Sequence, residues 1–298
     1  MFKHIVVPLD GSALAESVLP AAASLASTLK ATITLIHLIE QNAPDEIHKD
    51  RHLTEAEEAE IYLQTIAKKN FTGANVDWHV HTAEVKNIAS SLASHAEELK
   101  ADLILMCAHG RGGLRDILFG SIAQRVIALV QTPVLLLRPD SSPEHGAFAL
   151  HKIMLPLDDE STHDEIFPYA KYLAKAYKSE IVMVTVIPTF GTLTGEQAAE
   201  SSLLPGTTMA LLDMKEQAAR KHLQIHVDDL QQAGLAAAAG IVRGDPATEI
   251  VKAAEKLSAD LILLATHRKA GMDAFWAGSV APDVARKTKI PLLLLPLK

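Results

Sequence analysis

The chain has 298 residues, of which 48% are hydrophobic and 21% charged, a balance typical of a globular protein with room for two domains. Its formal net charge of −8 argues against nucleic acid as a partner, because that binding depends on neutralising phosphates. The single cysteine excludes an intramolecular disulfide and indicates a cytoplasmic protein, and the short apolar runs predict no membrane insertion.

Apolar runs of strand length alternate with helical spacing along the first half of the chain. Strands are predicted at 4–9, 31–39, 75–81, 102–107 and 134–137, and helices at 13–29, 54–69, 87–99 and 121–130. Strands as uniformly apolar as these are expected where helices cover both faces of a sheet. The pattern therefore predicts an α/β domain with a doubly wound, five-stranded parallel sheet.

The second half repeats this plan, with strands predicted at 152–157, 180–187, 237–242, 260–265 and 292–295. Pro8 and Pro156 occupy matching positions 148 residues apart, whereas Asp102 and Asp260 match at a separation of 158. About ten additional residues are therefore expected within 188–240. The repeat indicates two tandem domains, 1–140 and 148–298, joined by a linker at 139–147 that is rich in Pro, Ser and Gly.

Two loops of the first half are expected at the same edge of the sheet, beyond the carboxyl ends of the strands. One follows the first strand and carries Asp10, and the other follows the fourth strand and carries Gly110 and Arg111. Glycine lets the backbone approach a phosphate, arginine can add charged hydrogen bonds, and Gly120-Ser121 opens a helix whose free N–H groups favour anions. The Asp10 carboxylate suits ribose hydroxyls or Mg²⁺.

Each of these residues also has a purely structural interpretation. Gly110 could serve only as a turn, Ser121 as a helix cap, and Asp10 as the capping carboxylate of the helix at 13–29. The two loops together at one sheet edge favour a binding site.

The runs 4–12, 101–104, 109–114, 119–121 and 132–135 resemble the universal stress protein family in its tandem two-domain form. The resemblance implies that family's adenine nucleotide alpha hydrolase-like fold in both halves. ATP-binding members carry the pattern Gly, two residues, Gly, nine residues, Gly-Ser/Thr. Gly110 and Gly120-Ser121 satisfy its later part, and Cys107 stands in place of the first glycine.

By this resemblance the first half binds ATP, with Mg²⁺ held through the nucleotide near Asp10. Adenine is expected near Leu38 and Met106, ribose near Asp10, and the phosphates on the glycine-rich loop and the helix start. The expected binding residues are Pro8, Leu9, Asp10, Gly11, Ser12, Leu38, Met106, Cys107, His109, Gly110, Arg111, Gly113, Gly120, Ser121 and Ile122.

The second half departs further from the motif. Ala265 and Arg268 occupy the positions of the first two glycines, and Asp159-Glu160 replace Gly11-Ser12. A side chain in place of glycine and two added carboxylates both oppose phosphate binding, so we expect weaker ATP binding there. In the first half, Lys86 stands where the family usually has glycine, in a loop expected to be peripheral to the nucleotide.

We expect ATP to act as a regulatory ligand in a stress response, since the loops show no clear pair of general base and nucleophile; slow hydrolysis stays open. The alternatives are a partner-binding or scaffold protein with vestigial sites, and a binder of AMP or cyclic AMP. Family members pair through the last strand, so the two halves are expected to form a pseudo-dimer within the chain, and a homodimer of whole chains is a further option.

Several other polar residues have more than one interpretation. His48 and His52, like His222 and His226, have the i, i+4 spacing of metal ligands on a helix, or they lie on solvated helix faces. His79 and His81 share one face of a strand and are predicted to be structural. Cys107 is either a redox-active thiol or a buried small hydrophobe.

Overall fold

A computed structural model describes residues 1–44, 46–47, 50–108, 120–139, 148–158, 165–266 and 279–297. The sheet strands of the first half are β1 (His4–Pro8), β2 (Thr32–Glu40), β5 (Val76–Val85), β6 (Leu103–Cys107) and β7 (Val134–Leu137). Those of the second half are β8 (Lys152–Pro156), β9 (Glu180–Ile187), β10 (Ala237–Arg243), β11 (Leu261–Thr266) and β12 (Leu292–Pro296).

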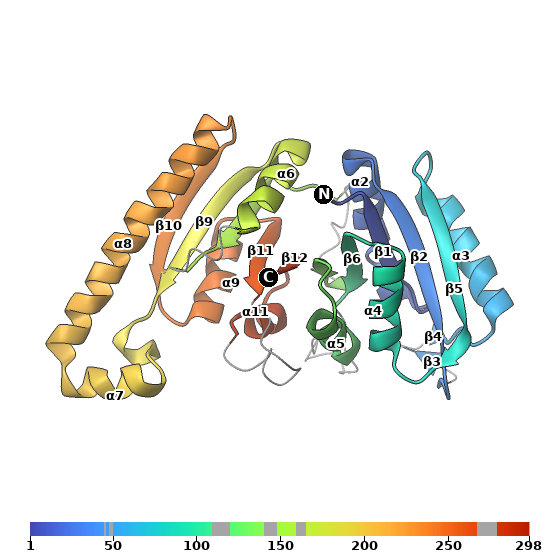
Figure 1. The fold of residues 1–298 in the computed structure, drawn as a ribbon, viewed down its shortest axis with the longest axis horizontal. Coiled ribbons are helices and arrows are strands. Elements are labelled where there is room, and N and C mark those ends of the chain that lie inside the picture. Colours follow the sequence, from blue (N-terminus) through green and yellow to red (C-terminus); the bar gives the residue numbers. More distant parts are fainter. Residues whose placement is uncertain are drawn as a thin grey trace.

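These strands form one sheet in the order β10-β9-β8-β11-β12-β7-β6-β1-β2-β5, and the two halves lie side by side (Figure 1). Neighbouring strands are parallel except β7 and β12, which run antiparallel. The predicted α/β class, with a five-stranded parallel sheet repeated in tandem, is confirmed.

Helices cover both faces of the sheet, as the uniformly apolar strands predict. One face packs against α1 (Ala13–Glu16), α2 (Leu19–Leu29), α3 (Ala56–Asn70), α6 (Phe167–Tyr177) and α8 (Pro205–Gln232). The other packs against α4 (Ile88–Glu98), α5 (Ser121–Leu129), α9 (Pro246–Lys256) and α11 (Ala281–Lys287). Each face of the sheet has its own hydrophobic core, and successive strand residues pack alternately into the two. Ile5 and Val7 pack in the core under α1, α2 and α3, and Val6 packs in the core under α4 and α5.

The duplication extends to local hydrogen bonding. The Asp102 carboxylate accepts from the backbone N–H groups of Lys3 (2.7 Å) and His4 (3.1 Å). The Asp260 carboxylate, 158 positions later, accepts from those of His151 (2.7 Å) and Lys152 (2.8 Å). Asp102 directly precedes β6 and so ties the start of β1 to the start of β6. Asp260 directly precedes β11 and ties the start of β8 to the start of β11 in the same way.

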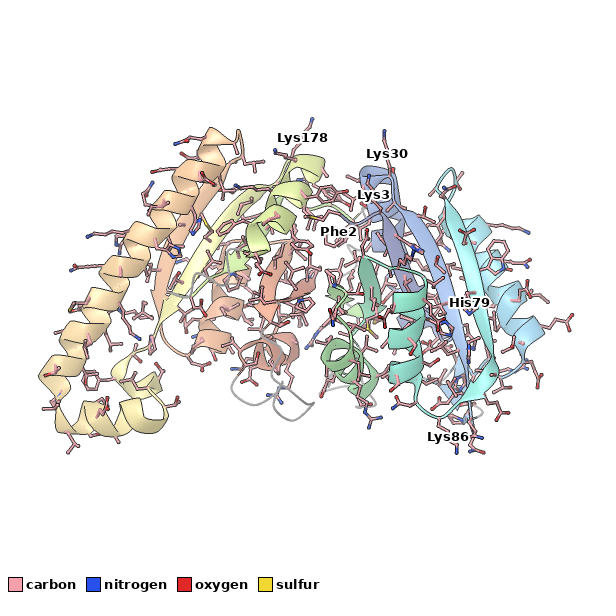
Figure 2. The ribbon with its side chains drawn as sticks, viewed as in Figure 1. Phe2, Lys3, Lys30, His79, Lys86 and Lys178 are labelled. Carbon is pink, nitrogen blue, oxygen red and sulfur yellow. The ribbon has the colours of Figure 1, made fainter. Side chains whose placement is uncertain are left out.

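The helix ends repeat as well. Lys30 ends α2 and Lys178 ends α6, both in the left-handed conformation, with φ of 53° and 58°. They lie at the same end of the two halves (Figure 2). This conformation lets the cap N–H bond back to the last helical turn, to Ala26 and Ala174 respectively.

The two halves are joined by β7 and β12. Leu135 pairs with Leu293 and Val134 with Leu294, and these side chains are at most 3% exposed. Each fully buried leucine contributes about 1.5–3 kcal/mol of hydrophobic free energy. Phe2 extends the contact: its ring lies 5.7 Å from that of Tyr169 and 6.0 Å from that of Tyr172. Figure 2 shows Phe2 near the start of the chain, between the two halves.

The helix predicted at 13–29 is two helices, because α1 ends at Glu16 and α2 begins at Leu19. Pro20 occupies the first turn of α2, where its missing N–H costs nothing. In a continuous helix the Pro20 ring would clash with the carbonyl of Glu16, so the proline requires the break.

The additional residues of the second half form a 3₁₀ helix (Phe190–Thr192), α7 (Gly195–Leu203) and a long α8. Helix α8 has 28 residues, whereas α3, its counterpart in the first half, has 15. No helix in the described part of the chain is both long enough and apolar enough to cross a membrane.

The prediction that His48 and His52 could share a helix face is wrong. Around them lies a short antiparallel hairpin, β3 (Glu46–Ile47) and β4 (Asp50–Arg51). His48 is outside the described residues. His52 follows β4, is buried, and its Nδ1 lies 3.2 Å from the carbonyl oxygen of Pro44.

Candidate functional site

A pocket of about 310 Å³ lies at the carboxyl ends of β1, β2 and β6 in the first half. Such a crevice is where open parallel sheets place their ligands. Its walls come from these three strand ends, the β3–β4 hairpin, the loop between β5 and α4, and the start of α5. The lining residues are Pro8, Leu9, Asp10, Ala15, Ile36, His37, Leu38, Glu40, Ile47, His52, Lys86, Asn87, Ile88, Ala89, Leu92, Met106, Cys107, Gly120, Ser121, Ile122, Ala123 and Arg125.

Asp10 is held by the turn that follows β1. Its Oδ1 accepts hydrogen bonds from the backbone N–H of Ser12 (2.9 Å) and from the Ser12 hydroxyl (2.6 Å). The Ser12 Oγ in turn accepts from the N–H of Ala15 (3.1 Å) and so caps α1. The interpretation of Asp10 as the helix cap is therefore wrong: Ser12 is the cap, and Asp10 orients it while facing the pocket.

Gly11 and Ser12 support the pocket from behind and are not part of its lining. Gly11 has φ +89°, a conformation that side chains rarely adopt. A Cβ built on it would lie 2.9 Å from Cγ and Cδ1 of Leu53, which follows β4. The glycine thus permits both the turn and the close approach of the hairpin.

One wall of the pocket is apolar. Leu38 and Met106, the two residues expected beside adenine, both line it, together with Ile36 from β2 and Leu92 from α4. Cys107 also lines the pocket, but it packs in the core on the other face of the sheet; it is buried and accepts a hydrogen bond from the Ser17 hydroxyl at 3.4 Å. A flat apolar ligand group could be enclosed here without leaving a buried polar atom unpaired.

Two helices begin at the pocket. Gly120 is the N-cap of α5 and makes no side-chain capping bond, so the interpretation of Ser121 as the cap is wrong. Ser121 is the first helical residue and is exposed. At the start of α4, the Asn87 side chain caps the helix by accepting from the N–H of Ser90 (3.2 Å). Both helix starts present N–H groups and the positive end of a helix dipole.

The loop between β5 and α4 was expected to be peripheral, but Lys86, Asn87 and Ile88 line the pocket. Figure 2 places Lys86 at the carboxyl end of β5. Sequence reasoning also missed Arg125, which lies one helical turn beyond Ser121. Its i, i+4 spacing from Ser121 was the available signal, since it places both residues on one helix face.

His37 connects the pocket floor to the β3–β4 hairpin. Its Nδ1 lies 2.8 Å from the carbonyl oxygen of Leu9, and its Nε2 lies 3.0 Å from that of Leu53. The ring is 1% exposed. Through its two ring nitrogens His37 thus links the loop after β1 to the segment after β4.

Charges of both signs surround the pocket. Asp10 and Glu40 line it beside Lys86 and Arg125. Behind the first loop, the Tyr62 hydroxyl donates to the Glu16 carboxylate at 3.0 Å. Burial, followed by the charge of Glu16 and then that of Asp10, raises the pKa of Tyr62 far above its ordinary value, so Tyr62 remains a hydrogen-bond donor.

Of the expected binding residues, Pro8, Leu9, Asp10, Leu38, Met106, Cys107, Gly120, Ser121 and Ile122 line the pocket. His109, Gly110, Arg111 and Gly113 lie outside the described residues. So do Asp159, Glu160 and Arg268, on which the expectation of a weaker second site depends, while Ala265 is described as part of β11.

The sequence pattern of the universal stress protein family matches the chain twice, at residues 1–138 and 149–296. The chain belongs to this family. Each match covers one half of the duplicated fold, so this universal stress protein contains two copies of the family's unit in tandem.

Among curated relatives, the universal stress protein Sll1654 of Synechocystis is 31% identical over 137 residues, which is 46% of this chain and 85% of the relative. The universal stress protein MJ0531 of Methanocaldococcus jannaschii is 29% identical over 149 residues, or 46% of this chain and 83% of the relative. A universal stress protein structure from Archaeoglobus fulgidus matches 99% of both chains with a TM-score of 0.74 at 17% identity, a likeness of fold.

Proposed function

We propose that the first domain, residues 1–140, binds ATP or another adenine nucleotide as a regulatory ligand in a stress response. The observation that carries the proposal is the pocket where an apolar wall, the Asp10 carboxylate and the start of α5 converge. In ATP-binding members of the family, the motif that Gly110 and Gly120-Ser121 match holds the nucleotide.

The apolar wall suits the adenine ring. Leu38 is 7% exposed and Met106 6% exposed, and they come from β2 and β6, on either side of β1. A planar base between them would contact apolar side chains from both strands. Ile36 and Leu92 extend the same surface.

The Asp10 carboxylate is placed for the ribose or for Mg²⁺. Its Oδ1 is fixed by the N–H and hydroxyl of Ser12, which sets the orientation of the whole group. Carboxylate oxygens accept from vicinal hydroxyls and are hard ligands that Mg²⁺ prefers, usually together with phosphate oxygens. Asp10 is therefore the residue that would hold the metal brought by the nucleotide.

The phosphates would lie at the start of α5. The N–H groups of Ser121, Ile122 and Ala123 have no acceptor within the helix, whose first backbone bond runs from Gln124 to Gly120. Gly120 leaves this end uncovered by a side chain, and Arg125 and Lys86 supply positive charge nearby. Helix N-termini with this composition bind phosphates.

Binding of labelled ATP at equilibrium, with matched variants in the two halves, tests the proposal. Gly110→Arg places a long side chain at a motif glycine and should abolish binding. Asp10→Asn should weaken it about tenfold, the loss expected for one hydrogen bond to a charged group. Asp158→Asn, the same change at the corresponding position of the second half, should leave the affinity unchanged.

A wild-type chain that binds no adenine nucleotide would contradict the proposal, as would equal effects of Asp10→Asn and Asp158→Asn. Competition with AMP and cyclic AMP identifies the preferred ligand. If the α5 end holds the outer phosphates, ATP displaces the label at lower concentration than either monophosphate.

The alternative function is binding of a protein partner. It is favoured by apolar side chains exposed on α7 and α8, where Leu203 is 79%, Met214 65% and Ile225 64% exposed. Exposed apolar side chains that form a contiguous patch mark interaction surfaces. The nucleotide assay separates the two functions, because a partner-binding protein with a vestigial pocket would bind no ATP.

We further propose that the two domains, 1–140 and 148–298, pair within one chain as a pseudo-dimer, supported by the β7–β12 ladder and the Phe2 contacts. The single cysteine supports a cytoplasmic location. Association of whole chains into a homodimer remains a proposal that the exposed apolar residues of α8 support.

A further inference from the structure

Three histidines meet between the edge strand β5 and helix α4, outside the pocket. His79 and His81 alternate on β5 and so point to the same face of the sheet (Figure 2 shows His79 on β5). That face carries α4, since His79 and His81 are in register with Ile36 and Leu38 of β2, which pack in the α4 core. His95 lies on α4, one turn before its end.

The rings are close together. His95 and His81 have ring centroids 4.8 Å apart, and His95 and His79 5.0 Å apart. One ring nitrogen from each histidine lies within 4.8 Å of the other two. The closest approach joins His95 Nε2 and His81 Nδ1 at 3.0 Å.

The hydrogen bonding in this histidine cluster is incomplete. In the described part of the chain, His79 Nε2 is the one buried side-chain nitrogen or oxygen atom without a hydrogen-bond partner. A buried polar atom without a partner costs about 1–3 kcal/mol, and native proteins contain few of them. A ligand that accepts a nitrogen lone pair would remove this cost.

The distances suit a metal ion. Two imidazole nitrogens on a tetrahedral Zn²⁺, each bonded at about 2.0–2.1 Å, lie roughly 3.3 Å apart. The observed separations, at most 4.8 Å, would shorten as the side chains rotate onto the ion. The His95 side chain is 12% exposed, so an ion can enter from solvent.

A carboxylate stands behind one of the rings. His95 Nδ1 lies 3.2 Å from Oε2 of Glu98, which leaves Nε2 directed at His81. A carboxylate that accepts from the second nitrogen of a histidine is the usual support of a metal ligand.

We propose that His79, His81 and His95 bind a divalent transition-metal ion such as Zn²⁺, with water as the fourth ligand. Three imidazoles without a thiolate suit ions of borderline softness. The ion would join the edge strand β5 to α4. This site is separate from the proposed nucleotide pocket and does not depend on it.

The other histidine pair of the structure provides the control. His222 and His226 lie one turn apart on α8, with their Nε2 atoms 3.0 Å apart. His226 also stacks on Phe167 at 4.3 Å. Two ligands on one helix bind a metal far more weakly than three, so removing this pair should not affect the high-affinity site.

The experiment uses the full, tag-free chain, stripped of metal with a chelator and titrated with Zn²⁺ by calorimetry. We expect one tight equivalent in the wild type and in the double variant His222→Gln/His226→Gln. His79→Gln and His95→Gln should each lose it, and Glu98→Gln should bind about tenfold more weakly, as when a supporting carboxylate is removed. Circular dichroism confirms that each variant folds.

Histidine side-chain NMR of the wild type makes the result independent of any variant. On addition of one equivalent of Zn²⁺, the ring resonances of His79, His81 and His95 should shift together. The proposal is overturned if the wild type binds no tight equivalent, if His95→Gln leaves the affinity unchanged, or if the shifts fall on His222 and His226 instead.

Discussion

Several residues around the pocket determine the backbone conformation as much as they offer contacts to a ligand. Gly11 lies in the run 4–12 that resembles the family, yet in the structure it lies behind the pocket, with φ +89° and with Leu53 in the space that a Cβ would occupy. Asp10 and Ser12 form the hydrogen-bonded turn that this glycine allows. The sequence could indicate that these residues matter, but the contact is made by Leu53, 42 residues further along the chain, and no local sequence signal predicts it.

Gly11→Ala should therefore destabilise the protein more than the same change at Gly73. Both glycines have positive φ, so each alanine variant should lose about 1–2 kcal/mol of folding free energy, because alanine disfavours the left-handed conformation. Only at Gly11 does the new Cβ meet another residue, which adds about 1 kcal/mol or more of overpacking. Urea unfolding at neutral pH measures the difference, and equal losses for the two variants would contradict it.

At the scale of elements, apolar periodicity predicted the strands and most helices, whereas the exceptions depend on tertiary contacts. The β3–β4 hairpin has only two residues per strand, too few for a periodic signal. The loop at 86–88 lines the pocket because α4 starts there, which the sequence of the loop alone does not reveal. The histidine cluster joins a strand to the following helix, so no fixed spacing indicates it.

The caps of α4 and α9 occupy equivalent positions and allow a matched comparison. Asn87 accepts from the N–H of Ser90 at 3.2 Å, and Asp245 accepts from the N–H of Thr248 at 3.0 Å. Replacing either residue by alanine should cost about 1 kcal/mol at pH 7. Only Asp245 titrates: hydrogen bonds from Thr248, and then the charge of Lys287, lower its pKa below the ordinary 3.8.

A carboxyl group with a lowered pKa in the folded state stabilises the protein above its unfolded pKa and loses that contribution as pH falls through the folded value. The destabilisation by Asp245→Ala should therefore be greatest above pH 3.8 and shrink as the pH falls further, while that by Asn87→Ala stays constant. Urea unfolding from pH 7 down to pH 2.5 measures both. If the free energy of unfolding lost in Asp245→Ala did not change with pH, the charge of Asp245 would not contribute to the cap.

The whole molecule is one sheet built from two copies of the same unit. The strand positions and the internal repeat were both predictable, because apolar runs and matching Pro and Asp positions recur along the chain, whereas the order of the strands in the sheet was not predicted. The halves meet through β7 and β12; the family resemblance implies pairing through these last strands, whereas their leucines by themselves indicate only burial. The Phe2 contact with Tyr169 and Tyr172 also joins residues far apart in sequence.

Two copies of one fold need not mean two sites. In the first half the pocket combines an apolar wall, a fixed carboxylate and the start of α5, whose N-cap Gly120 makes no side-chain capping bond. In the second half the sequence replaces Gly11-Ser12 with Asp159-Glu160 and the second motif glycine with Arg268. We therefore propose that this universal stress protein has one nucleotide site per chain.

Calorimetric titration of the nucleotide-free, full-length protein with Mg²⁺–ATP tests this claim most directly. We predict a stoichiometry of one ATP per chain, which Gly110→Arg reduces to zero. Two equivalent sites per chain would show that the second half has kept its function. No binding at all would show that both pockets are vestigial.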